Sequence, residues 1–431
     1  MKKAKSLAAR AVFYIFSRIL GEKLSPKTKE FVGNLSFVTS GTVALAAVMA
    51  VVQIVAGRVI GPEEYGKVAL VVSVGSALSL FCMAGIDSAC VYYLSSSGAA
   101  KRTISDAFGG LFLGAVIIFS LALISMGAWS SALGLSPAVA SFGVLYAALS
   151  SLQKIHKAIL RGLGEMKRFA FYDILSALAA AVIFATALAF HDKIGFRVVT
   201  FTQLAIFVSF SLATAVKIYP YVGKPSFAGL KKLYTYGLFI FWGSLGILVL
   251  TQADRLIVNY FLGHERTGLY SGYLLASNAV IFQLYSSLAV ILFPVAARTK
   301  DKDAFVRKAT KFLLRLAPAF YLLCFGANSA VIVLLGRQYP YNIYLVALFS
   351  LAAVLYVAYG IYGQLLGARG PSGVRRNSFY VSISAVFFLV CSAVLMPRYG
   401  LFGAAGALMA ANATLAALQI KALFGKAPPS G

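Results

Sequence analysis

Long apolar segments dominate this chain and leave it little choice of fold. Twelve of them run through the 431 residues, separated by short polar connections. About 20 mainly apolar residues are enough to cross a bilayer as a helix. We therefore expect an all-α polytopic membrane protein with twelve transmembrane helices. The predicted spans are 35–57, 68–95, 104–128, 137–160, 169–190, 197–219, 235–262, 268–296, 312–335, 342–368, 376–396 and 401–424.

The positions of Lys and Arg predict the orientation of this bundle. If the predicted spans alternate in direction, the side that holds the N-terminus receives 31 of the 39 basic residues and the other side receives 7, with Arg255 left inside a span. Basic loops stay on the cytoplasmic side. We expect a multi-pass protein of the cytoplasmic membrane with both termini in the cytoplasm. The net charge of +26 then favours contact with anionic membrane lipids, and no nucleic-acid partner is expected.

The first 33 residues differ from the rest, because they are basic and only patchily apolar. On a helical wheel, apolar side chains share one face and polar ones the other. This pattern predicts an interfacial amphipathic helix on an anionic leaflet. A signal peptide is the alternative, but Arg18 interrupts the apolar run and no clear small-residue cleavage site follows.

A short glycine motif recurs at half the length of the chain. Gly61-Pro-Glu-Glu-Tyr-Gly66 follows the first predicted span, and Gly263-His-Glu-Arg-Thr-Gly268 follows the seventh. The same place in each set of six spans predicts two pseudo-symmetric six-helix lobes, related as parallel repeats. The predicted parts are an amphipathic segment 1–33, a first lobe 34–219, a linker 220–234, a second lobe 235–424 and a tail 425–431.

The seventh predicted span carries a charged pair, Asp254 and Arg255, within otherwise apolar sequence. Such residues cost about 2.5 to 3.5 kcal/mol each at mid-membrane on insertion scales, so they are expected to face a bundle interior or a watery cavity. The alternative is that both lie near the end of the span, where long side chains reach the headgroups. Neighbours on a helix point about 100° apart, so each is expected to find a partner on a different helix.

Several arginines lie near the ends of predicted spans, where they could face a central cavity. The candidates for substrate binding are Arg58, Arg161, Arg255 and Arg298, and Arg369 is placed similarly. Arg suits phosphate, because its planar fork binds two oxygens and keeps its charge. The alternative for any one of them is anchoring to lipid headgroups.

Acidic residues within the membrane are few. Asp87 and Asp254 are candidates for coupling to H⁺ or Na⁺, since a buried carboxylate in a transporter can bind either ion. Asp173 is expected to form a buried salt bridge or an interfacial cap instead. The scattered histidines His156, His191 and His264 and the four cysteines show no metal-ligand spacing, and no catalytic motif is present. We expect neither a metal nor a cofactor, and no enzymatic activity.

Taken in order, the motifs resemble those of the polysaccharide flippase family. This is the Wzx-like branch of the superfamily that also contains multidrug and toxin extruders and the lipid II flippase. The resemblance covers nearly the whole chain. The matching motifs are Arg58 to Leu70, Gly85-Ile-Asp87, Ala253-Asp254-Arg255, Leu262-Gly263, Gly268-Leu-Tyr270, Leu292-Phe-Pro294, Leu335-Gly336 with Tyr339, Tyr399-Gly400 and Gly403-Ala-Ala.

The resemblance implies a flippase that moves polyprenyl-pyrophosphate-linked oligosaccharide from the cytoplasmic to the outer leaflet, by alternating access through a cationic cavity. A monomer is expected. Flipping of a lipid II-type precursor and cation-coupled drug extrusion are the alternatives within the superfamily. A membrane enzyme that builds glycans is disfavoured, because all six outer loops are short.

Overall fold

The protein is built from helices in the part of the chain that the structure describes. This computed structural model describes residues 26–97, 100–190, 194–277, 285, 292, 296, 299 and 301–425. Every regular element within these residues is helical. The expected all-α class is therefore confirmed.

The first half of the chain supplies seven α-helices and one 3₁₀ turn within the described residues. Their connections are short, as expected between neighbouring membrane helices. The elements are α2 (Pro26–Met83), α3 (Ile86–Ser97), α4 (Ala100–Ile124), α5 (Met126–Ala132), α6 (Pro137–Gly162), α7 (Met166–Phe190), α8 (Phe196–Ile218) and the 3₁₀ turn η1 (Tyr219–Tyr221).

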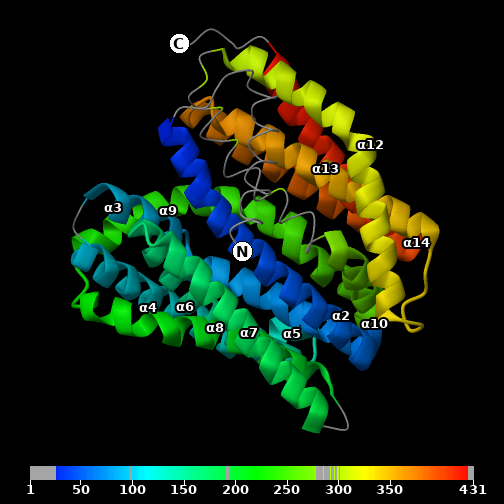
Figure 1. The fold of residues 1–431 in the computed structure, drawn as a ribbon. Coiled ribbons are helices and arrows are strands. Elements are labelled where there is room, and N and C mark those ends of the chain that lie inside the picture. Colours follow the sequence, from blue (N-terminus) through cyan, green and yellow to red (C-terminus); the bar gives the residue numbers. More distant parts are fainter. Residues whose placement is uncertain are drawn as a thin grey trace.

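The second half adds long helices that form their own group. They are α9 (Phe227–Leu248), the π-helix η2 (Val249–Ala253), α10 (Asp254–Ala276), α12 (Lys302–Leu335), α13 (Ile343–Gly367) and α14 (Pro371–Phe424). Figure 1 shows α12, α13 and α14 on one side of the molecule and α4, α6, α7 and α8 on the other, with α2 and α10 between them.

Nine helical stretches of the described chain are long and apolar enough to cross a membrane. Three of them are interrupted by a glycine with non-helical backbone: Gly61 in α2, Gly263 in α10 and Gly400 in α14. Each glycine falls between two predicted spans, so the predicted order agrees with the structure. The number twelve stays a prediction, because the eighth predicted span, 268–296, extends beyond the described residues.

Local chemistry explains why α2 breaks at Gly61. Its φ of 75° lies in the left-handed region, which a residue with a Cβ adopts only at a cost. Pro62 follows, and its fixed φ and missing N–H suit the first position of a new helix. Glu63 and Glu64 then lie in the first turn of that helix, where the helix dipole favours negative charge.

The second motif adopts the same backbone as the first. Gly61 has φ 75° and ψ 171°, and Gly263 has φ 83° and ψ 178°. The motifs also pack against each other. A Cβ added to Gly66 would strike the backbone of His264, and one added to Gly268 would strike the backbone of Pro62.

This contact is reciprocal, because Pro62 and His264 hold the same position in the two motifs. It is the packing that a two-fold relation between the halves produces. We call the end of the bundle where residues 61–66 meet residues 263–268 the turn end. The opposite end, where α6 ends at Gly162 and α12 begins at Lys302, is the basic end.

Hydrogen bonds confirm which helix termini meet at the basic end. Lys302 donates to the carbonyl of Ala368 at 2.9 Å, which joins the start of α12 to the end of α13. Arg369 donates to the carbonyl of Leu423 at 2.8 Å and so reaches the end of α14. Arg369 also pairs with Asp303 at 2.6 Å. These contacts assign Arg369 to a brace between helix ends.

The buried apolar residues form four clusters, and the clusters follow the two halves. Two contain residues of the second half alone, and the other two contain mainly residues of the first half. From the second half, Leu233, Tyr234 and Tyr236 of α9 and Leu256 of α10 join the first-half clusters. Each half therefore has its own core, and α9 and α10 connect the two.

The predicted boundaries between segments and lobes agree with the helix ends in the structure only in part. α2 begins at Pro26, inside the predicted amphipathic segment 1–33, whose first 25 residues lie outside the described part. α9 begins at Phe227, inside the predicted linker 220–234. α14 ends at Phe424 with Gly425 as its C-cap. The division into two lobes at these boundaries stays a prediction.

Candidate functional site

The charged pair of the seventh span lies directly after an irregular turn. α9 ends at Leu248, the π-helix η2 follows, and α10 begins at Asp254. A π-turn inserts an extra residue and re-aims the side chains beyond it, and such turns are frequent at functional sites. Here the turn determines the directions in which Asp254 and Arg255 point.

Asp254 points into the interior of the second half. Its side chain is buried, with the residue 2% exposed. One carboxylate oxygen accepts a hydrogen bond from the backbone N–H of Arg255 at 2.9 Å, and the other accepts one from the hydroxyl of Tyr270 at 3.0 Å. No Lys or Arg side chain of the described chain forms an ion pair with Asp254.

Arg255 points toward the first half. It is 9% exposed, and its Nη1 donates to the side-chain oxygen of Gln252 at 2.9 Å. Its Nε is buried and has no hydrogen-bond partner in the described chain. The guanidinium interacts electrostatically with the phenol groups of Tyr65 and Tyr146, both in the first half. The Arg255 guanidinium therefore lies at the seam between the two halves, and within the described chain its Nε–H is free to donate a further hydrogen bond.

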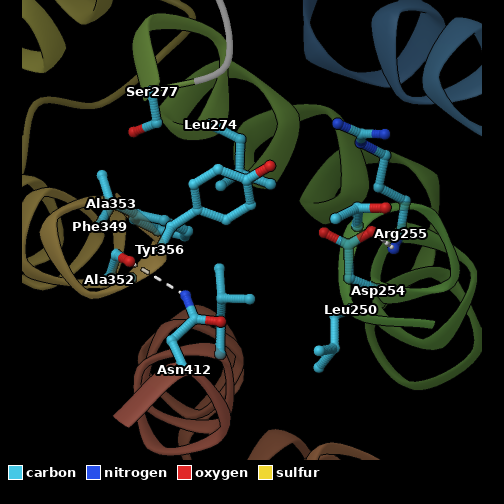
Figure 2. A pocket seen from close by; sticks show the side chains of 12 residues that line it. Leu250, Asp254, Arg255, Leu274, Ser277, Phe349, Ala352, Ala353, Tyr356 and Asn412 are labelled. Carbon is cyan, nitrogen blue, oxygen red and sulfur yellow. Dashed lines mark hydrogen bonds between the residues drawn. The ribbon is translucent and has the colours of Figure 1, made fainter. Parts of the chain in front are cut away.

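A small cavity adjoins this pair. Figure 2 shows the Asp254 carboxylate and the amide of Asn412 at its wall, with the Arg255 guanidinium directed away toward the first half. Thr251 and Ser277 add hydroxyl groups to the lining, which is otherwise apolar or aromatic. Its volume is about 60 Å³. A space of this size holds a few water molecules or a small cation, and not an oligosaccharide.

The three predicted arginines within the described chain lie at different places along the bundle. Arg58 is exposed on the first arm of α2 near the turn end, and Arg161 is exposed in the last turn of α6 at the basic end. Arg255 lies buried between them. Arg298 lies outside the described residues. Their role in substrate binding stays a prediction.

The other predicted acids have different surroundings. Asp87 lies in the first turn of α3, half-buried. Asp173 of α7 is buried and pairs with Lys157 at 2.6 Å, so the predicted buried salt bridge is confirmed. The Lys157 ammonium also lies over the rings of Phe169 and Phe210, at 5.6 and 5.1 Å from their centroids.

Sequence reasoning missed one residue, Lys154. It lies inside α6, half-buried, eight residues before the helix ends at Gly162. Its ammonium donates to the hydroxyl of Ser79 at 2.9 Å, and Ser151 bonds to the same hydroxyl at 2.8 Å. Asp87 acts on it electrostatically from α3. The helical periodicity of 137–160 could have indicated that Lys154 lies within the membrane.

Metal binding finds no support in the described part of the chain, which holds no group of three His, Cys, Asp or Glu residues suited to a metal ion. His156 bonds to Thr214 at 2.7 Å inside the first half, and His264 bonds to Asn259 at 2.6 Å near the turn end. His191 lies outside the described residues. The histidines with described contacts are thus held by neighbouring polar groups.

Apolar helices in two halves, with a buried cation at the seam, are the architecture of a membrane transporter. Solved structures of such transporters share the fold. An inward-facing multidrug transporter of the MATE family superposes with a TM-score of 0.65 at 15% identity, over 96% of this chain and 99% of that one. A transporter of the same superfamily from Pyrococcus furiosus, described as having a binding pocket of reversed polarity, gives 0.60 at 14% identity, over 93% and 98%.

The chain belongs to the polysaccharide biosynthesis protein family, whose profile matches residues 54–343. This confirms the resemblance to the polysaccharide flippase family drawn from the motifs. A probable low-salt glycan biosynthesis flippase of Haloferax volcanii is 22% identical over 197 residues, which cover 44% of this chain and 41% of that one. An uncharacterized membrane protein of Methanocaldococcus jannaschii is 21% identical over 185 residues, 41% and 36% of the two chains. The chain spans about two fifths of the length of these relatives.

Proposed function

We propose that this protein moves polyprenyl-pyrophosphate-linked oligosaccharide from the cytoplasmic to the outer leaflet. The observation that carries the proposal is Arg255, a buried cation at the seam between two halves with an unpartnered Nε. Its Nε is a buried donor without a hydrogen-bond partner in the described chain, which is costly, and a pyrophosphate offers it several negative oxygens. Membership of the polysaccharide biosynthesis family supports a glycan-bearing substrate.

Lys154 supplies a second cation for the same substrate. It reaches its position from α6 in the first half, and within the described residues its ammonium donates to Ser79 alone. Arg255 belongs to the second half. A substrate that meets both residues would be held by both halves, as a mechanism in which the halves move relative to each other requires.

The size of the cavity supports alternating access. The cavity beside Asp254 has a volume of about 60 Å³, too small for a sugar headgroup, so the headgroup would enter this place only after the halves separate. The close glycine contact shuts the turn end, and the fold is more similar to the inward-facing than to the outward-facing MATE structure, with TM-scores of 0.65 and 0.57. These observations support a state that receives substrate at the basic end, in the cytoplasm.

Asp254 is proposed as the ion-coupling residue. Its carboxylate shares a small cavity with the hydroxyls of Thr251 and Ser277 and the amide of Asn412. Such oxygen groups suit a hard cation such as Na⁺, and a carboxylate there can instead bind a proton. Transport by the Asp254→Asn variant should no longer respond to an imposed sodium or proton gradient. A variant that keeps the wild-type response would remove Asp254 from the coupling mechanism.

The central test is transport of a lipid-linked oligosaccharide in reconstituted vesicles, at matched protein levels. Arg255→Ala should lose most activity, and Arg255→Lys should recover only part of it, because Lys keeps the charge but lacks the bidentate fork. Arg337→Ala, at an exposed position near the turn end, is the matched control and should transport like wild type. If Arg255→Ala also transports at the wild-type rate, Arg255 is not the pyrophosphate ligand.

Orientation needs its own test. In a background without the four native cysteines, Ser131→Cys at the turn end should react with an impermeant thiol reagent added from outside. Lys302→Cys at the basic end should not react. The reverse pattern would show that the basic end faces outward, and substrate would then have to enter from the opposite side.

Drug extrusion is the second candidate, and it is favoured by one observation, the buried Asp254 without an ion pair. A cavity acid can bind a cationic drug. The same vesicles should therefore be assayed with a cationic dye. Uptake of the dye that depends on Asp254, without transport of the oligosaccharide, would favour extrusion over flipping.

A further inference from the structure

An apolar groove lies on the first half, close to the charged pair. Residues of α2, α4 and α5 form most of it, among them Leu78, Leu121 and Trp129, and its volume is about 360 Å³. Ligand pockets in proteins have volumes of about 300 to 1,000 Å³. The groove is therefore large enough for part of an extended hydrocarbon chain, while the cavity of about 60 Å³ beside Asp254 is not.

One wall of the groove comes from the second half. Leu256 of α10 lines it together with the first-half residues, and it also packs into a first-half core cluster. Leu256 is the residue next to Arg255, only about 1.5 Å further along the helix axis. Three consecutive residues thus have different surroundings. Asp254 lies in the interior of the second half, Arg255 lies at the seam, and Leu256 lines the groove.

Trp129 keeps the groove apolar despite its polar indole nitrogen. The indole N–H donates to the backbone carbonyl of Ala122 at 2.9 Å, so its hydrogen bond is made within the protein. The helix that carries it, α5, is joined to α10 by a bond from Asn259 to the carbonyl of Leu133 at 3.0 Å. The groove and the start of α10 are therefore held in a fixed relation in this conformation.

We propose that this groove binds the first part of the polyprenyl chain while Arg255 holds the pyrophosphate. The inference rests on the proposed function and adds the path of the tail. A hydrocarbon chain does not fit the cavity of about 60 Å³ beside Asp254, so it must leave the pyrophosphate along another apolar surface. The groove begins at the neighbour of Arg255 and offers that surface.

The chain provides its own reporter, because it contains two tryptophans. Trp129 lines the groove, and Trp242 is 69% exposed on α9. The Trp242→Phe variant leaves Trp129 as the reporter, and Trp129→Phe leaves Trp242 as the matched control. Both variants are placed in vesicles of brominated phospholipid, which quenches tryptophan on contact, and are titrated with undecaprenyl pyrophosphate.

The fluorescence of Trp129 should rise and saturate, because the unbrominated tail displaces phospholipid from the groove. That of Trp242 should stay constant. Undecaprenol, which lacks the pyrophosphate, should require a much higher concentration. An unchanged Trp129 signal would show that phospholipid keeps the groove, and an equal rise at both tryptophans would show only dilution of the quencher. Either result overturns the proposal.

A second variant separates the groove from the proposed function. Ala77→Phe places a ring in the groove, and Ala185→Phe places the same ring at an exposed position of α7. Ala77→Phe should weaken binding of undecaprenyl pyrophosphate about tenfold, as a modest steric clash does, with no effect of Ala185→Phe. If Arg255→Ala abolishes transport while Ala77→Phe binds and transports normally, the proposed flippase function is supported and the proposed binding of the tail in the groove is wrong. If Ala77→Phe weakens binding while Arg255→Ala transports normally, binding of the tail in the groove is supported and the proposed role of Arg255 is wrong.

Discussion

The two halves of the chain place different side chains at equivalent positions. Asp254 and Arg255 lie nine and eight residues before Gly263, and Val52 and Gln53 hold the same places before Gly61. Tyr270, which bonds to Asp254, corresponds to Val68. Val52 and Val68 are both buried in one apolar cluster. The first half therefore forms the same helix and turn with two valines. The second half has Asp254 and its hydrogen-bond donor Tyr270 at the same two positions.

This difference teaches that the charged pair is not needed for the fold. The first half satisfies the same backbone turn with valines, at no cost of burying a charge. The second half accepts that cost at Asp254 and Arg255, which is expected at a functional site. The first half also buries an acid, Asp173, but pairs it with Lys157. Asp173 therefore has an ionic partner on another helix, whereas Asp254 is held by hydrogen bonds and by the neighbouring Arg255.

The largest expected effect comes from breaking the pair in the first half. Lys157→Ala leaves Asp173 as an uncompensated charge, which should lower the free energy of unfolding by about 3 to 5 kcal/mol. Thermal unfolding in detergent measures this loss. The double variant Lys157→Met, Asp173→Leu should recover most of the stability, since two apolar side chains replace the pair. A single variant as stable as wild type would mean that the pair does not hold α6 and α7 together.

Arg255→Gln installs the residue of the first half and should act on transport instead of stability. Loss of a hydrogen bond to a charged group costs about 1.5 to 3 kcal/mol, equivalent to about a 10- to 150-fold lower rate of oligosaccharide transport. The melting temperature should stay close to that of wild type. Unfolding at a clearly lower temperature would make Arg255 a structural residue and weaken the comparison between the halves.

Much of this comparison could be drawn from the sequence. The apolar segments predicted the order of the helices, and the glycine motifs at half the chain length predicted the matching turns. The cost of charge in a membrane singled out Asp254 and Arg255. These arguments depend on composition and spacing along the chain, which the sequence contains directly.

Partners across helices could not be predicted in the same way. Tyr270 bonds to Asp254 only because the chain reverses at Gly263 and brings the two arms of α10 together. The π-turn before Asp254 shifts the register of the helix, and no sequence pattern marked it.

Substituting either glycine of the contact at the turn end should weaken that contact by the same amount. Gly66→Ala and Gly268→Ala each add a Cβ that meets backbone of the other half, and overpacking costs about 1 to 3 kcal/mol. The turn end should open more often in both variants. The measurement is the reaction rate of Thr267→Cys, at a buried position of this contact, with an impermeant thiol reagent in a background without native cysteines.

Gly326→Ala is the control for this pair, because nothing lies within 4 Å of its added Cβ. It should leave the reaction rate of Thr267→Cys unchanged. If Gly66→Ala and Gly268→Ala change the rate by very different amounts, the contact is not a two-fold one, and the pseudo-symmetry of the halves would be limited to their backbone turns.

The smallest expected effect concerns a residue that breaks the symmetry, Asn259. Its equivalent in the first half is Gly57, which has no side chain. Asn259 donates to the carbonyl of Leu133 across the seam at 3.0 Å and bonds to His264 at 2.6 Å. Asn259→Ala should lower the free energy that holds the turn end closed by about 1 kcal/mol. Thr267→Cys should then react roughly fivefold faster. Because the glycine contact remains, the increase should stay below that of Gly66→Ala. A larger increase would mean that the bond across the seam, and not the paired glycines, keeps this end shut.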